Sequence, residues 1–218
     1  MTNPRTALRL LWLALALAAW LICFVMLVRF GTWFAFALAG AALVALALRF
    51  DPALLGLLRP SVAKLAIGFL LGALMVLLTH MAFAVVTTRL PEARTAALRL
   101  YGLLNASGFP PAACAALVVV IATCEEVLFR GVLTGRDPLA DRNGLQGLVT
   151  WRGLGGIVVL AACYAAATLP LGSFALAGCA LLCGTAWGGL CVATRSLVPA
   201  IVAHVVWDLG VLFAWPLL

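Results

Sequence analysis

The sequence predicts an all-α protein, a polytopic transmembrane bundle of about seven helices. Of its 218 residues, 66% are hydrophobic and only 10% are charged, whereas soluble domains are about half apolar and a quarter charged. The apolar residues also gather in runs close to the length of about 20 residues that spans a bilayer. We therefore expect one integral membrane domain over residues 1–218, with lipid as its main surroundings.

The first predicted span, residues 10–28, follows a basic start that contains Arg5 and Arg9. Its apolar run is longer than the apolar part of a usual signal peptide, and a second apolar run follows almost at once. We therefore expect this segment to be retained as a helix.

Six further apolar runs complete the predicted bundle, at residues 32–48, 62–86, 112–133, 156–169, 171–193 and 197–215. The run at 112–133 begins after Pro110 and Pro111, and proline is tolerated in the first turn of a helix. Residues 89–105 mix charged and apolar side chains, which predicts an amphipathic helix at the membrane surface. Residues 135–153 are polar and are predicted to form an aqueous loop.

Basic residues predict the orientation of the bundle, because cytoplasmic loops carry an excess of lysine and arginine. With a cytoplasmic N-terminus, the cytoplasmic side holds nine: Arg5, Arg9, Arg49, Arg59, Lys64, Arg136, Arg142, Arg152 and Arg195. The opposite side holds four: Arg29, Arg89, Arg94 and Arg99. We therefore expect the N-terminus in the cytoplasm, in a bacterial inner membrane. The net charge of +7 is spread over short loops, so no nucleic-acid partner is expected.

Two adjacent acids, Glu125 and Glu126, lie within the fourth predicted span, with Arg130 one turn later. On insertion scales, a charged side chain at the centre of a membrane helix costs roughly 2.5–3.5 kcal/mol. Such residues usually serve chemistry, ion passage or a buried polar lock.

Polar residues of the last span lie at a similar depth. At 1.5 Å per residue, Glu126 is about 15 Å from the level of Arg136, and His204 and Asp208 are about 13.5 and 19.5 Å from that of Arg195. His204 and Asp208 are four residues apart and share one helix face. We therefore expect these side chains and the acidic pair to converge on a polar pocket inside the membrane.

The expected pocket suits hydrolysis of a bond presented at membrane depth. A carboxylate in a low-dielectric site is suited to proton transfer near neutral pH, so Glu125 is the candidate general base that activates water. Glu126 and Arg130 are expected to form an orienting ion pair. His204 is expected to donate to a developing oxyanion, with Asp208 orienting its ring. On the alternative that these residues are purely structural, Glu126 and Arg130 only neutralise each other's charge, and His204 and Asp208 only satisfy each other's hydrogen bonds.

Two motifs in these spans resemble a known family. Residues 125–131 read E-E-V-L-F-R-G, similar to the E-E-x-x-F-R-G motif of the CPBP intramembrane proteases, which comprise the type II CAAX prenyl endopeptidases and bacterial relatives linked to bacteriocin processing and immunity. Residues 197–199 read L-V-P and 204–208 read H-V-V-W-D, similar to the family's L-x-P and H-x3-N/D. The resemblance covers a protease core over residues 109–218 and implies a helical bundle in which the first glutamate activates water.

The family's middle motif, F-x3-H, is degenerate here, because the corresponding residues 164–168 read Y-A-A-A-T. Thr168 forms hydrogen bonds but does not act as a base at neutral pH. Three explanations stay open: Thr168 only positions Glu125, His80 reaches the pocket from the third span, or the protein is a non-cleaving relative.

The expected mechanism uses no metal or other cofactor. Glu125, His204 and Asp208 offer three ligands on paper, the number that a catalytic zinc requires, but the H-E-x-x-H motif is absent. None of the seven cysteines shows C-x2-C spacing.

The leading hypothesis is an intramembrane endopeptidase that cleaves a membrane-anchored peptide or protein tail. The first alternative is a non-catalytic membrane immunity or scaffold protein of the same family. The second is a proton-coupled carrier, since buried acids and histidine form proton relays.

Overall fold

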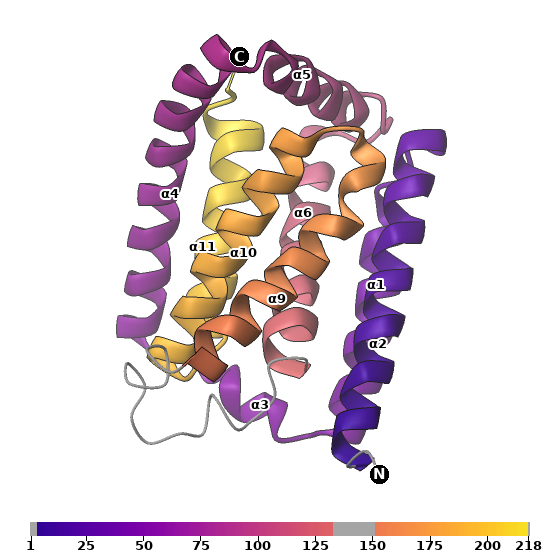
Figure 1. Ribbon diagram of the computed structural model, residues 1–218, viewed down its shortest axis with the longest axis vertical. Coiled ribbons are helices and arrows are strands. Elements are labelled where there is room, and N and C mark those ends of the chain that lie inside the picture. Colours follow the sequence, from indigo (N-terminus) through magenta and orange to yellow (C-terminus); the bar gives the residue numbers. More distant parts are fainter. Residues whose placement is uncertain (1–3, 133–150, 218) are drawn as a thin grey trace.

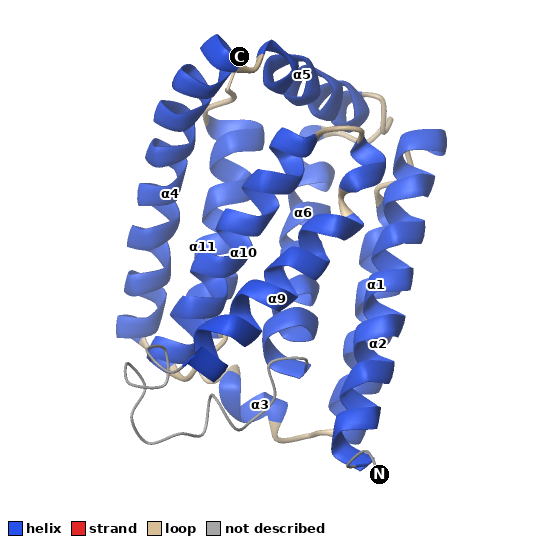
Figure 2. Ribbon diagram, in the orientation of Figure 1, coloured by secondary structure: helices blue, strands red, loops and turns tan. Residues whose placement is uncertain are grey.

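The computed structural model describes residues 4–132 and 151–217, which form helices and no strand (Figure 2). Within these residues, five helices are long and apolar enough to cross a membrane: Leu11–Phe30, Val62–Arg89, Pro111–Val132, Gly153–Leu171 and Phe174–Thr194. Two shorter apolar helices accompany them, Phe34–Phe50 and Val198–Ala214. Each coincides over most of its length with one predicted span, so the predicted polytopic helical bundle is confirmed.

The helices run mostly along the long direction of the molecule, and α5 lies across the end near the C-terminus (Figure 1). In chain order they are α1 (Pro4–Phe30), α2 (Phe34–Phe50), α3 (Leu54–Leu57), α4 (Val62–Arg89), α5 (Pro91–Asn105), α6 (Pro111–Glu125), the π-helix η1 (Glu126–Val132), α9 (Trp151–Ala167), the 3-10 helix η2 (Leu169–Leu171), α10 (Phe174–Thr194), α11 (Val198–Leu209) and the π-helix η3 (Gly210–Ala214).

The sequence predicted two segments between the spans from their charged residues, a surface helix and an aqueous loop. The amphipathic segment predicted at 89–105 is α5, which turns Ala93, Ala96 and Leu104 inward. The predicted loop at 135–153 was wrong at its end, since residues 151–153 already belong to α9. The remainder of that loop, with the depth marker Arg136, lies outside the described residues.

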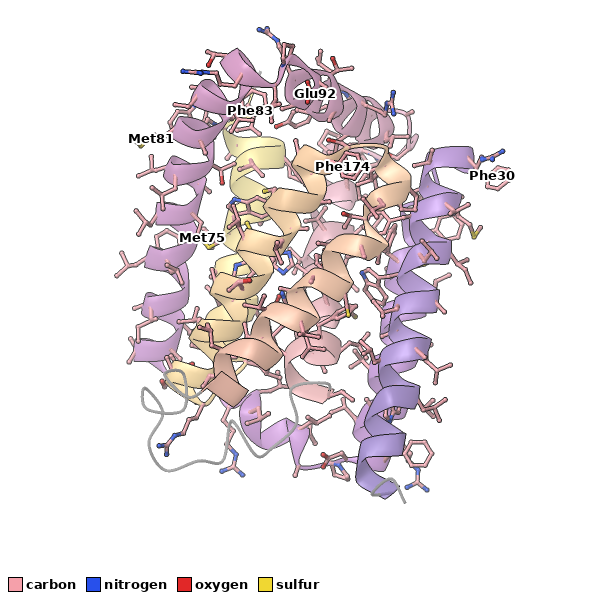
Figure 3. The ribbon with its side chains drawn as sticks, in the orientation of Figure 1. Phe30, Met75, Met81, Phe83, Glu92 and Phe174 are labelled. Atoms are coloured by element: carbon pink, nitrogen blue, oxygen red, sulfur yellow. The ribbon has the colours of Figure 1, made fainter. Side chains whose placement is uncertain are left out.

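The outer surface of the bundle is apolar. Phe30 on α1 and Met81 on α4 are exposed and point away from the other helices (Figure 3). Leu70, Leu74 and Leu78 continue this exposed apolar surface along α4. A helical surface of this kind suits hydrocarbon, in which a helix satisfies its own backbone hydrogen bonds. The protein is an integral membrane protein.

Glycines bring α4 against α11. A Cβ atom on Gly68 would lie 2.6 Å from the Pro199 carbonyl oxygen, and one on Gly72 would lie 2.7 Å from that of Ala203. Small residues at membrane helix interfaces allow such close backbone approach. The contact fixes α11 at the residue that precedes His204.

An aromatic cluster joins α1 to α2 and η1. The Trp20 ring lies edge-to-face against Phe36, with centroids 6.1 Å apart, and against Phe129, with centroids 5.7 Å apart. Edge-to-face pairs of this kind stabilise a core beyond the area they bury. Because Trp20 is fully buried, α1 is held firmly beside the acidic pair.

Candidate active site

The acidic pair lies where the helical geometry changes. Glu125 is the last residue of α6, and Glu126 begins η1, which also carries Arg130. All three side chains are buried. π-helical turns are rare and occur frequently at functional sites, and the sequence did not predict this one.

Glu126 is held by two basic side chains. Its Oε1 atom lies 3.1 Å from Arg130 Nη1 and 2.9 Å from His204 Nδ1. Arg130 also donates from Nη2 to the carbonyl oxygen of Gly184, at 3.1 Å. Gly184 leaves room for this contact, since a Cβ atom there would lie 2.9 Å from Arg130 Nη2. The expected pair of Glu126 and Arg130 is therefore present, with α10 as its support.

Glu125 is held by two neutral donors. The indole Nε1–H of Trp20 donates to Oε1 at 2.6 Å, and the hydroxyl of Tyr164 donates to Oε2 at 2.9 Å. His204 Nε2 lies 3.7 Å from the same Oε2 atom. The two neighbouring carboxylates thus have different surroundings, one with hydrogen-bond donors and the other with an ion pair.

His204 lies between the acids. Its Nδ1 atom is directed at Glu126 Oε1, 2.9 Å away. This places Nε2 on the side of Glu125 and of Asp208, whose Oδ2 atom is 3.5 Å away. The ring stacks on Trp187, with centroids 3.6 Å apart and planes 18° apart. Glu126 is thus the closer carboxylate partner of His204, whereas we expected Asp208 to orient the ring.

A cavity of about 210 Å³ adjoins these groups. The side chains of Glu125, Tyr164, Thr168, His204 and Asp208 all line it, and Glu126 is not among its lining residues. The rest of its wall is mostly apolar and aromatic and reaches towards α5, with Phe24, Trp33, Ile121, Leu176 and Tyr101 among its members. An apolar cavity with a few convergent polar groups is the usual form of a binding site.

Thr168, which directly follows α9, lines the cavity, but its hydroxyl donates to the Ala165 carbonyl oxygen at the end of that helix, at 2.7 Å. From the last turns of α9, Tyr164 donates a hydrogen bond to Glu125. The helix that carries the degenerate motif therefore does contribute a hydrogen bond to the acid, through the first residue of that motif.

His80 lies elsewhere. Its Nδ1 atom is 2.9 Å from the Val76 carbonyl oxygen, and its ring stacks on Trp215 with centroids 3.9 Å apart. It is not among the residues that line the cavity. The structure therefore does not bring His80 to the acidic pair.

Sequence reasoning missed three aromatic residues of this site: Trp20, Tyr164 and Trp187. A buried tyrosine or tryptophan usually finds a hydrogen-bond partner, so Tyr164, four residues before Thr168, carried a signal. Trp20 is 105 residues from Glu125, and nothing in the sequence joins them. In the described part of the chain, no group of three His, Cys, Asp or Glu side chains is arranged to hold a metal ion.

One known protein family matches part of the chain. Residues 107–210 match the family model described as type II CAAX prenyl endopeptidase Rce1-like. The match includes both motifs, α6, η1, α9, α10 and α11, and it confirms the resemblance drawn from residues 125–131 and 204–208. No curated protein and no solved structure matches the chain.

Proposed function

Because residues 107–210 match the Rce1-like type II CAAX prenyl endopeptidases, we propose that this protein is an intramembrane endopeptidase in which Glu125 activates the attacking water. The observation that carries the proposal is the contrast between the two acids. Glu125 is buried yet lines the cavity, whereas Glu126 is bound to Arg130 and His204. Glu125 is therefore the acid that a water molecule in the cavity can reach.

In the proposed reaction, Glu125 takes a proton from water, and the water oxygen attacks the carbonyl carbon of the scissile peptide bond. The carbonyl oxygen becomes negative and accepts a hydrogen bond from Nε2–H of a doubly protonated His204 ring. The proton on Glu125 then passes to the leaving nitrogen as the C–N bond breaks.

The ion pair has a supporting role. Glu126 holds His204 through Nδ1–H, and Arg130 holds Glu126 in turn. With Nδ1 engaged, the opposite edge of the ring faces the cavity. Asp208 lies beside that edge and is proposed to hold Nε2–H between turnovers.

The proposed substrate is a membrane-anchored peptide or protein tail. The mostly apolar wall of the cavity favours an apolar segment, and the surrounding bilayer delivers an anchored chain. A prenyl group is not required by this proposal. A metal-free mechanism, a bacterial inner membrane and a cytoplasmic N-terminus stay predictions.

Glu125→Gln tests the proposal directly. The amide cannot accept the proton of water, so cleavage of a membrane-anchored peptide should fall by about 10²–10⁴-fold, the usual contribution of a general base. Glu92→Gln makes the same substitution at an exposed position on α5 and should cleave normally. Retained cleavage by the Glu125→Gln protein, at normal accumulation in the membrane, would exclude Glu125 as the base.

A second candidate function is a non-catalytic immunity or scaffold protein. It is favoured by Thr168, which stands where the family motif has a histidine and donates its hydroxyl to Ala165. This candidate predicts that Glu125→Gln keeps its full biological effect in cells. The two functions are therefore separated by the same variant.

A further inference from the structure

Two donors from separate helices bind the two oxygens of Glu125. Trp20 on α1 donates to Oε1, and Tyr164 on α9 donates to Oε2. Both donor residues are buried, and Trp20 is 0% exposed. The carboxylate is therefore held from both sides without a counter-charge in either hydrogen bond.

These two donors fix the terminal torsion of the Glu125 side chain, which is otherwise weakly restrained. The terminal torsion of a glutamate side chain has a broad, roughly two-fold preference, so burial alone does not orient its oxygens. An ionised carboxylate accepts about four hydrogen bonds. With one donor on each oxygen, accepting positions are left for a water molecule in the cavity.

The donors are themselves held by packing. Phe129 contacts both rings edge-to-face, with centroids 5.7 Å from Trp20 and 5.2 Å from Tyr164. Phe36 packs on the other part of the Trp20 ring. Catalytic groups are held in productive geometry by residues whose own rotamers are locked in this way.

We infer that Trp20 and Tyr164 are positioning residues for Glu125, and that helix α1, outside the matched segment 107–210, completes the site. For its catalytic consequence the inference rests on the proposed function. It assigns to Tyr164 the contact with Glu125 that Thr168, bonded to Ala165, does not make.

The kinetic test uses the full-length protein in lipid vesicles and a membrane-anchored peptide. Trp20→Phe and Tyr164→Phe each remove one donor and keep an aromatic ring. We expect kcat to fall by about 10–100-fold in each, as for a displaced catalytic group, with KM within about threefold because each variant keeps an aromatic ring at the site. Trp12→Phe is the matched control, since Trp12 is buried on the same helix and does not line the cavity. It should keep kcat and KM.

A double-mutant cycle in thermal stability gives a readout that does not depend on activity. The shift in Tm caused by Trp20→Phe should shrink in a Glu125→Ala background, because the hydrogen bond is already lost. The shift caused by Trp12→Phe should be the same in both backgrounds. Additive shifts for Trp20 would overturn the contact.

The two measurements separate the inference from the proposed function. If the wild-type protein cleaves and both donor variants keep its kcat, the inference fails and the proposed function stands. If the wild-type protein does not cleave any anchored peptide, the proposed function fails. The cycle then decides whether Trp20 holds Glu125.

Discussion

The two histidine regions of this protein share much of their geometry. His204 on α11 stacks on Trp187 at 3.6 Å, and His80 on α4 stacks on Trp215 at 3.9 Å, with interplanar angles of 18° and 21°. Their partners differ. Three carboxylates lie within 4 Å of His204, whereas the His80 ring contacts the Val76 carbonyl oxygen of its own helix through Nδ1.

The difference shows that a stacked histidine in a membrane helix is not by itself a site. His80 resembles a packing residue, because its Nδ1 atom contacts the Val76 carbonyl oxygen one turn earlier on α4. His204 lies between acids of two other segments and faces a cavity. Convergence of charges from separate helices, rather than histidine itself, distinguishes the candidate site.

Among substitutions in the two histidine regions, His204→Asn should have the largest effect. The proposed oxyanion donor and the partner of Glu126 are removed together, so kcat/KM should fall by about 10²–10³-fold, as for loss of one oxyanion donor. The measurement is steady-state cleavage of an anchored peptide by protein in vesicles. A variant that keeps more than a tenth of the wild-type kcat/KM would contradict the proposed role.

Asp208→Asn should have a smaller effect. The Asp208 oxygen is 3.5 Å from His204 Nε2, further than Glu126 is from Nδ1, and its side chain is partly exposed to the cavity. We expect kcat/KM to fall about tenfold, equivalent to about 1.4 kcal/mol. If the loss equals that of His204→Asn, Asp208 has a more direct role than a supporting one.

Trp187→Phe and Trp215→Phe compare how much the stacked indole contributes to stability beside His204 and beside His80. Trp187 is buried, stacks on His204 and lies 5.6 Å from the Arg130 guanidinium, so the free energy of unfolding should fall by about 1 kcal/mol. Trp215→Phe is the matched variant at His80, where the indole is exposed, and should change it by no more than about 0.5 kcal/mol. Thermal unfolding in detergent measures both. Equal losses would show that the two stacks contribute alike.

The sequence was a good guide to the bundle, because each span is encoded locally by an apolar run. It also placed Glu125, Glu126, Arg130, His204 and Asp208 correctly near one another, since depth along a helix follows from residue number. In the folded chain, ion-pair contacts of 2.9–3.7 Å connect these five side chains.

The rotation of each helix about its axis, which decides the side chains that face the site, could not be predicted from the sequence. Glu125 lines the cavity and Glu126 does not, and the π-helical turn η1 that begins between them leaves no signal in an apolar run. The contact of Trp20 with Glu125 depends on where α1 packs, and that is set by aromatic rings on three segments. Thr168 was chosen by motif alignment, and the side chain of α9 that touches Glu125 is Tyr164.

His80→Phe should have the smallest effect and tests the comparison from its other side. Phenylalanine keeps a ring for stacking on Trp215, and the contact it loses is to a backbone carbonyl that its helix already uses. We expect kcat/KM to change by less than about threefold and the free energy of unfolding by no more than about 0.5 kcal/mol. A loss of cleavage above tenfold, with normal thermal stability, would instead make His80 a participant in catalysis. In that case His80 and Glu125 would have to approach each other in a conformation other than this one, since the ring now lies against Trp215.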